Sequence, residues 1–215
     1  MVHLAEQVRV YTGDRPDLLA YIPSGTQRVL DVGCATGDVG AALKAYGKAS
    51  EVVGLELSPV AAARAREQLD DVVQGDIEIA EVPYPDGYFD VLLYADVLEH
   101  LKNPWALLAS HRRLLRPGGT VIAALPNIGY LSTILMLLRH QWQYEDLGIM
   151  DYTHLRFFTR SSLLDMFKRT GFGDVRIYRR APEGWRARMV RIATLGYGTD
   201  YTIPSFVCVA RQSGL

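Results

Sequence analysis

The stretch VLDVGCATG, residues 29–37, decides the fold of this 215-residue chain. Its apolar run ends at an acidic residue, Asp31, and breaks into a glycine-rich turn, and residues 38–45 behind the turn have a helical pattern. A buried parallel strand followed by a tight turn and a helix N-terminus forms a nucleotide pocket at the carboxyl edge of a sheet. Glycine suits such a turn because it adopts positive φ and has no β-carbon to hold a ligand away from the backbone. The carboxylate of Asp31 favours a ligand with positive charge over a pyrophosphate.

Length and composition favour a single soluble domain over residues 1–215. A chain of this length can bury a sizeable core, and no Pro/Gly/Ser-rich linker divides it. The net charge of −1 predicts neither a nucleic acid nor an anionic membrane as a partner. The two cysteines, Cys34 and Cys208, are far apart in the sequence, which indicates neither a disulfide framework nor a metal-binding motif.

We expect neither a signal peptide nor a membrane-spanning segment. Residues 1–10 contain Glu6 and lack an apolar core. The longest apolar stretch, residues 130–138, is too short to cross a bilayer. A cytoplasmic location is therefore the default expectation. We expect a monomer or a homodimer.

Apolar runs alternate with helical patterns along the chain, which is typical of a doubly wound α/β sheet. Near-continuous apolar character favours parallel strands that are covered on both faces. Strands are predicted at residues 29–32, 52–57, 72–74, 89–95, 121–125, 175–179 and 205–210. Helices are predicted at residues 16–21, 38–45, 59–69, 104–115, 130–139 and 161–170, with Ser58, Asn103 and Thr159 as N-caps.

The regular alternation of predicted strands and helices ends after residue 125. Residues 127–158 combine a helical stretch with an aromatic, polar loop, so we expect an insertion after strand five that forms a lid over the acceptor. The helical stretch places its leucine and isoleucine side chains on one face, which we expect to cover the sheet or the acceptor. The last two strands have no full helix between them. The predicted fold is a Rossmann-like, seven-stranded sheet that is mostly parallel with an antiparallel last strand.

Short motifs stand at the ends of the predicted strands and at their turns. They are Asp31-x-Gly33-x-Ala35-x-Gly37, Glu56, Gly75-Asp76-Ile77, Phe89-Asp90-x-Leu92 and Leu115-Arg116-Pro117-Gly118-Gly119. Together they resemble the class I S-adenosylmethionine-dependent methyltransferases over about residues 11–173. The resemblance implies S-adenosylmethionine as cofactor and S-adenosylhomocysteine as product.

The resemblance places the methionine portion of the cofactor at the turn. Gly33, Cys34 and Gly37 would receive it together with Asp31, because its ammonium and sulfonium charges favour a nearby carboxylate.

The other motifs would hold the nucleoside. Glu56 would accept hydrogen bonds from both ribose hydroxyls. Leu57 and Ile77 would enclose the adenine, and Asp76 would accept from its exocyclic amine. The Ala95 carbonyl, at the end of the fourth strand, would lie near the amino group of the ligand.

Two other functions stay open. Ala35 stands where the resembled family commonly has glycine, which implies a slightly tighter fit. An NAD-dependent oxidoreductase also combines a glycine turn with a later acid, but its fingerprint needs glycine at position 35 and gives no role to Asp31 or Asp76. The second alternative is a cofactor-binding, non-catalytic or regulatory subunit of a methyltransferase complex.

The acceptor is suggested only by resemblance. Residues 96–101 and 153–159 resemble the ubiquinone-pathway O-methyltransferase branch. Residues 126–159 look more like bacterial methyltransferases associated with cell-surface polysaccharide synthesis. We expect O-methylation of a small polar acceptor, such as a sugar, a quinol precursor or a related metabolite.

The candidate catalytic residues are His154, His100 and Asp96. Histidine has a suitable intrinsic pKa for a general base, and His154 lies in the insertion, so it is the preferred base with the other two in support. Its alternative role is to pin the loop by a hydrogen bond to backbone. A divalent metal bound by Asp96, Glu99 and His100 is a further alternative, which we do not favour. In the competing interpretation, Asp96 lines the donor pocket and Glu99 begins a helix.

Overall fold

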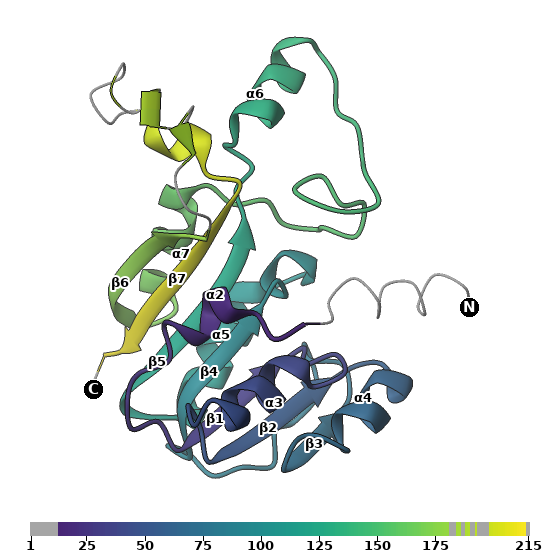
Figure 1. The fold of residues 1–215 in the computed structure, drawn as a ribbon, viewed down its shortest axis with the longest axis vertical. Helices are drawn as coiled ribbons and strands as arrows, with labels where there is room; N and C mark the ends of the chain where they lie inside the picture. Colours follow the sequence, from purple (N-terminus) through teal and green to yellow (C-terminus); the bar gives the residue numbers. More distant parts are fainter. Residues whose placement is uncertain (1–12, 181–183, 186–187, 190–191, 193–197, 214–215) are drawn as a thin grey trace.

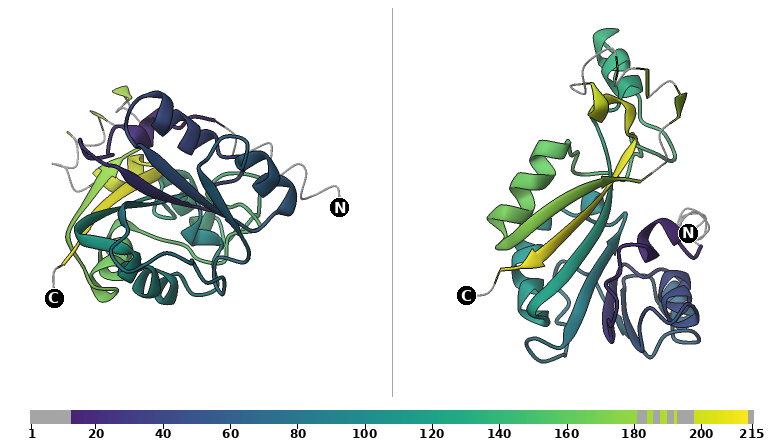
Figure 2. Two further views of the ribbon diagram at one scale, coloured as in Figure 1. Left: turned by 90° about the horizontal axis from the view of Figure 1, so that it is seen from below. Right: turned by 60° about the vertical axis from the view of Figure 1, so that its left-hand side comes forward.

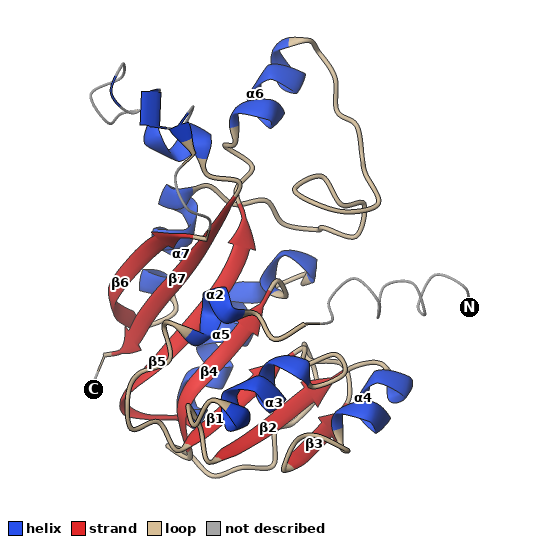
Figure 3. Ribbon diagram, viewed as in Figure 1, coloured by secondary structure: helices blue, strands red, loops and turns tan. Residues whose placement is uncertain are grey.

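The computed structural model describes residues 13–180, 184–185, 188–189, 192 and 198–213. Its centre is a seven-stranded sheet with the order β3-β2-β1-β4-β5-β7-β6 (Figures 1 and 3). The strands are β1 (Arg28–Val32), β2 (Glu51–Glu56), β3 (Asp71–Gln74), β4 (Phe89–Ala95), β5 (Leu115–Pro126), β6 (Phe172–Arg179) and β7 (Ser205–Gln212). Strands β1 to β5 pair in parallel, whereas β7 is antiparallel to both β5 and β6. The predicted Rossmann-like sheet with an antiparallel last strand is confirmed.

Helices cover both faces of this sheet (Figure 2). The α-helices are α2 (Pro16–Leu19), α3 (Asp38–Ala45), α4 (Pro59–Ala65), α5 (Pro104–His111), α6 (Leu131–Leu138) and α7 (Arg160–Arg169). Short 3₁₀ turns stand at η1 (Leu98–His100), η2 (Arg112–Leu114) and η3 (Thr199–Thr202). Side chains of α2, α3 and α4 pack in one buried cluster and those of α5 and α7 in the other.

The predicted N-caps start their helices as expected. Ser58 and Asn103 each accept a hydrogen bond from the backbone N–H of the third residue after them, and proline follows each cap. Thr159 and Ser162 form a reciprocal capping box at the start of α7. Such caps satisfy backbone donors that have no partner within the helix.

Two helices, α4 and α5, end four residues earlier than predicted. Helix α4 stops at Ala65, and residues 66–69 continue as hydrogen-bonded turns before β3. Helix α5 stops at His111, and the 3₁₀ turn η2 follows it. Leu115, the predicted last residue of that helix, instead begins β5, which pairs with β4 through a register shift between Phe89 and Val91.

The strand side chains divide between two cores. Leu30 and Val32 of β1 point into one buried cluster, and Val29 points into the other. This alternation follows from the two-residue period of a strand, and it makes both faces apolar. The core on the α5 and α7 side holds the large aromatic side chains Phe89 and Phe167.

The chain order of the strands reverses between β1 and β4. Strands β2 and β3 lie on one side of β1, and β4 and β5 lie on the other. Ligands of open α/β sheets bind outside the carboxyl ends of the strands at such a switch point. The fold therefore places the glycine turn after β1 at the position where a ligand is expected.

The insertion after β5 projects away from the sheet (Figure 1). Thr133 is the one buried side chain on α6, while Leu131, Leu135 and Leu138 are exposed. The expectation that this apolar face covers the sheet was therefore wrong, and its alternative role as a cover for the acceptor stays a prediction. Within the described residues, no helix has both the length and the apolar character to cross a membrane.

Candidate functional site

A cavity of about 500 Å³ opens at the carboxyl edge of β1, β2 and β4. Eight of the sequence-predicted site residues line it: Gly33, Glu56, Leu57, Asp76, Ile77, Ala95, Asp96 and His100. Ala35, which the turn motif included, also lines the cavity. The lining residues that sequence reasoning missed are Ser58, Ala61, Glu78, Val97, Leu101, Lys102 and Thr153. Most of these are direct neighbours of predicted residues, so the strand ends that the motifs marked were the available signal.

Glu56 links the turn after β1 to the segment after β2 in the cavity wall. Its Oε2 accepts from the backbone N–H of Ala35 at 2.9 Å, and its Oε1 accepts from that of Ser58 at 2.8 Å. An ionised carboxylate has about four acceptor positions, so this one retains capacity on both oxygens. The bonds fix the carboxylate against the turn after β1.

The turn after β1 is shaped by its first glycine. Gly33 has φ +72°, and a β-carbon there would lie 2.7 Å from Val97 Cγ2. Its backbone N–H donates to the Leu55 carbonyl at 2.7 Å, which ties the turn to β2. A side chain at position 33 would therefore push the turn away from the cavity wall.

Asp31 is buried behind that turn and does not line the cavity. One of its oxygens, Oδ2, has no hydrogen-bond partner within the described residues. Burial, with the negative charge of Glu56 in addition, raises the pKa of this carboxyl to about 7, although Arg15 acts in the opposite direction. Asp31 is thus a buried acid whose charge is poorly compensated by the protein itself.

Cys34 and Gly37 also lie outside the cavity lining. The Cys34 side chain is buried against Gly54 of β2, and burial raises the pKa of its thiol. Gly37 is the N-cap of α3 with φ +87°, and a β-carbon there would lie 3.1 Å from Ala65 Cα. The structure therefore gives both residues packing contacts, and their contact with a cofactor remains a prediction.

The opposite wall comes from the segments that follow β2 and β3. Leu57 is largely exposed at the mouth of the cavity, while Ile77 packs partly on the core. Asp76 Oδ1 accepts from the backbone N–H of Glu78 at 3.0 Å, so the residue closes a turn as well as lining the cavity. Two apolar side chains and one acidic side chain thus line this wall of the cavity.

Asp96 belongs to a four-membered ion cluster. Its oxygens accept from Arg15 Nη1 at 2.7 Å and from Arg180 Nη1 at 3.0 Å. Both arginines also bind Asp17, at 3.1 and 3.0 Å. Burial alone would lower the pKa of Arg15, but the neighbouring Asp96 and Asp17 raise it above its ordinary value. The cluster joins the N-terminal segment and the end of β6 to the cavity wall.

Sequence reasoning did not predict this cluster. Arg15 and Arg180 lie 81 and 84 positions from Asp96 along the chain. No local motif connects residues so far apart.

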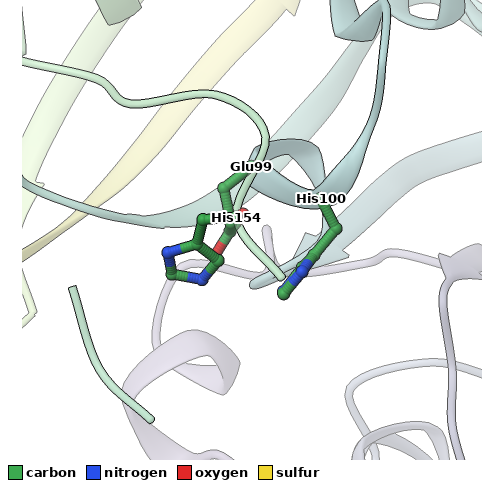
Figure 4. A group of neighbouring side chains, drawn as sticks. All are labelled: Glu99, His100 and His154. Atoms are coloured by element: carbon green, nitrogen blue, oxygen red, sulfur yellow. The ribbon is translucent and has the colours of Figure 1, made fainter. Parts of the chain in front are cut away.

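The remaining candidates meet beside η1 (Figure 4). The His100 and His154 rings lie 4.8 Å apart between centroids, with the carboxyl of Glu99 next to them. His100 lines the cavity together with Thr153, whereas His154 is buried behind them. The backbone explains the meeting, since the Glu99 carbonyl accepts from the N–H groups of residues 155 and 156.

Hydrogen bonds orient both imidazoles. His154 Nδ1 lies 3.1 Å from the Ile149 carbonyl, which can only accept, so Nδ1 carries the proton. Thr153 Oγ1 donates to Asp151 Oδ1 at 2.6 Å and lies 3.0 Å from His100 Nδ1. With its proton used toward Asp151, that hydroxyl accepts from Nδ1–H of His100. In both rings Nε2 is then the nitrogen with a lone pair.

Glu99 is buried, and its Oε2 has no hydrogen-bond partner within the described part of the chain. Burial, and then the charge of Asp96, raises the pKa of Glu99 well above its usual range. Burial, and then the neighbouring His154, lowers the pKa of His100. The metal set of Asp96, Glu99 and His100 was an alternative that the sequence analysis did not favour. In the structure two arginines bind Asp96, and His154 lies with Glu99 and His100 in its place.

The chain is similar to known methyltransferases in sequence. A family model described as "Methyltransferase domain" matches residues 4–177. A ubiquinone biosynthesis O-methyltransferase of Cereibacter sphaeroides (strain KD131) is 30% identical over 164 residues, which cover 74% of this chain and 65% of that protein. The 27-O-demethylrifamycin SV methyltransferase of Amycolatopsis mediterranei is 34% identical over 98 residues, 43% of this chain and 36% of the relative. The chain thus spans just under two thirds of the length of the ubiquinone-pathway relative.

The fold is also found among solved structures. A SAM-dependent methyltransferase from Archaeoglobus fulgidus superimposes with a TM-score of 0.67 at 21% identity, covering 97% of this chain and 98% of the other. The family match covers most of the chain, and the strand order and the position of the cavity agree with it. The chain belongs to the methyltransferase domain family.

Proposed function

We propose that the protein transfers a methyl group from S-adenosylmethionine to a hydroxyl oxygen of a small polar acceptor, such as a sugar, a quinol precursor or a related metabolite. The observation that carries the proposal is the carboxylate of Glu56, held by two backbone N–H groups in the wall of the cavity at the switch point. The names of two relatives, both O-methyltransferases, support oxygen as the receiving atom.

The donor end of the cavity fits the nucleoside. Glu56 would accept from the two ribose hydroxyls with the acceptor capacity that its backbone bonds leave. Leu57 and Ile77 offer apolar surface for the adenine, and Asp76 an acceptor for its amine.

The methionine portion fits the buried acid behind the turn. The unpartnered Oδ2 of Asp31 would favour an ammonium or sulfonium charge placed near it, because opposite charges attract strongly where water is excluded. The Ala95 carbonyl, at the end of β4, is the proposed acceptor for the amino group.

The acceptor would bind beside His100 and Thr153, at the end of the cavity that the insertion reaches. When bound, S-adenosylmethionine supplies an electrophilic methyl group whose bond to sulfur breaks with the electron pair leaving on sulfur. His154 is the proposed base that takes the hydroxyl proton, with His100 and Asp96 in support, and alignment is the main contribution of the protein.

The first experiment is a calorimetric titration of ligand-stripped protein with S-adenosylhomocysteine, with NADH as the control. We expect a dissociation constant on the order of 1–100 µM for S-adenosylhomocysteine and no heat with NADH. A ligand at 100 times its dissociation constant adds about 2.7 kcal/mol of stability, which is a melting shift of roughly 5–10 °C. Binding of NADH alone, or of neither compound, overturns the proposal in favour of an oxidoreductase or another class. Binding without turnover unless a second protein is added identifies a non-catalytic subunit.

Replacing Glu56 tests the assignment of the ribose. Glu56→Ala should weaken S-adenosylhomocysteine at least ~10-fold, because hydrogen bonds to a charged group contribute about 1.5–3 kcal/mol each. Glu51→Ala is the matched control, since Glu51 lies at the opposite end of the same strand and binds the Tyr88 hydroxyl. Unchanged affinity in Glu56→Ala contradicts the assignment.

A further inference from the structure

Glu99, His100 and His154 lie together beside the cavity, and one potential ligand atom of each lies within 4.8 Å of those of the other two (Figure 4). We propose that these three side chains bind a divalent first-row transition-metal ion, with open coordination positions for the acceptor hydroxyl. The site goes beyond the donor pocket and rests on the proposed function only for its role toward the acceptor.

The first support is the carboxylate. Glu99 is 1% exposed, and its Oε2 has no partner among the described residues. A buried polar atom without a partner is costly, so native structures rarely keep one without a reason. A bound cation converts that oxygen into a ligand atom and neutralises the carboxylate at the same time.

The second support is the orientation of the imidazoles. Nδ1–H of His154 donates to the Ile149 carbonyl, and Nδ1–H of His100 donates to Thr153, which in turn donates to Asp151. Metal-binding histidines almost always anchor their second nitrogen in this way, because it fixes the tautomer and raises the basicity of the other nitrogen. Both rings are thus in the tautomer that a metal ion requires.

The three ligand atoms need to move only a short distance to bind one ion. Ligand atoms bound at about 2.1 Å to one ion lie roughly 3–4 Å apart, so the three atoms would draw together by about an ångström. One carboxylate and two imidazoles suit zinc, manganese, iron or cobalt better than magnesium or calcium, which prefer oxygen ligands alone.

The position gives the ion a role. His100 and Thr153 line the cavity, so open coordination positions would face the acceptor end. A metal-bound hydroxyl loses its proton more readily, and the resulting oxyanion then attacks the methyl carbon while the electron pair of the breaking bond stays on sulfur. Nε2 of His154 cannot hold the ion and accept that proton at once, so water would take the proton when the ion is bound.

The test measures binding of the ion to the whole protein without any methyl donor or acceptor. Chelator-treated protein is titrated with Co²⁺ by visible absorption and with Zn²⁺ by calorimetry, with Mg²⁺ as the comparison. We expect one equivalent of Co²⁺ and of Zn²⁺ to bind, and Mg²⁺ at least ~100-fold more weakly. The two cysteines are buried, so they do not compete for the ions.

Variants locate the site. Glu99→Gln and His154→Gln remove a ligand and should each weaken Co²⁺ binding at least ~100-fold. Thr153→Val leaves all three ligands in place but removes the hydroxyl between His100 and Asp151, and it should weaken Co²⁺ binding about 10–100-fold. His140→Gln is the matched control, because His140 is an exposed histidine of the same insertion. Absence of Co²⁺ binding by the native protein at about 1 mM, or unchanged binding in both ligand variants, overturns the proposal.

S-adenosylhomocysteine titrations on the same samples keep the two proposals apart. A protein that binds S-adenosylhomocysteine but no Co²⁺ contradicts the metal site alone, and the reverse result contradicts the donor assignment alone. A variant that still binds S-adenosylhomocysteine is folded, so loss of Co²⁺ binding in it reports on the ligand set.

Discussion

At the scale of single residues, three carboxylates at the carboxyl edge of one sheet have three different environments. Glu56 accepts hydrogen bonds from two backbone N–H groups. Asp31 and Glu99 are both buried with one unpartnered oxygen, and burial raises both pKa values. The two poorly compensated acids lie where a positively charged ligand is proposed, at the donor for Asp31 and at the metal ion for Glu99.

The buried acid Asp31 predicts a pH-dependent stability of the ligand-free protein. Its pKa is about 7 in the folded chain and 3.8 for an ordinary aspartate, so between these values the folded state binds a proton that the unfolded state has lost. Stability is therefore highest below about pH 4 for this group and falls as the pH rises to 7. A shift of this size is worth about 4 kcal/mol in total.

The comparison with Asp31→Asn isolates that contribution, because asparagine is nearly isosteric and does not titrate. Urea unfolding of both proteins between pH 4 and 8 should show the native protein losing stability relative to the variant over this range. Parallel curves for the two proteins would show that Asp31 has an ordinary pKa in the folded state.

At the scale of the elements, the approach of α3 to α4 depends on one glycine. Gly37 combines φ +87° with a β-carbon position 3.1 Å from the backbone of Ala65. Gly37→Ala therefore adds backbone strain to overpacking between two helices, and it should destabilise the protein by about 2–4 kcal/mol. Gly47→Ala is the matched control, since Gly47 has φ +63° with nothing within 4 Å of its β-carbon position.

The control should lose only the strain contribution of about 1–2 kcal/mol, as measured by urea unfolding of both variants. Equal losses in the two variants would mean that α3 and α4 can separate at no cost. The difference between them otherwise measures the packing that Gly37 permits.

The sequence predicted elements better than it predicted their ends. The strands of the sheet were recognisable because an apolar run bounded by turn residues is a local pattern. The start of α7 was recognisable from Thr159 for the same reason. The end of α4 at Ala65 and the start of β5 at Leu115 were not, because packing and strand pairing with distant segments determine them.

The residues of the candidate site likewise fall into those with a local sequence signal and those placed by distant contacts. Glu56, Asp76 and Ala95 were predictable because each stands at the end of its strand or just beyond it, next to a turn. The arginines that bind Asp96 and the approach of His154 to Glu99 arise from contacts between distant parts of the chain. Such contacts leave no signal in a single sequence.

At the scale of the whole molecule, the described chain combines a well-packed sheet with an insertion that projects from it (Figure 1). The C-terminal end of the insertion is attached to the body of the protein, because the N–H groups of residues 155 and 156 donate to the Glu99 carbonyl. Helix α6, at the start of the insertion, has one buried residue, whereas α3 has four. Local opening costs little free energy where few side chains are buried.

Hydrogen exchange should therefore rank the two helices clearly. Backbone amides of α6 should exchange at least ~100-fold faster than those of α3, which corresponds to a difference in opening free energy of about 2.7 kcal/mol. S-adenosylhomocysteine should increase protection in β1 and α3, beside the donor end of the cavity, and leave α6 unchanged. Strong protection of α6 that grows with protein concentration would show instead that a second copy of the chain covers its exposed leucines. Strong protection that is independent of concentration would contradict the projecting position of the helix, because only contacts within one chain could then supply it.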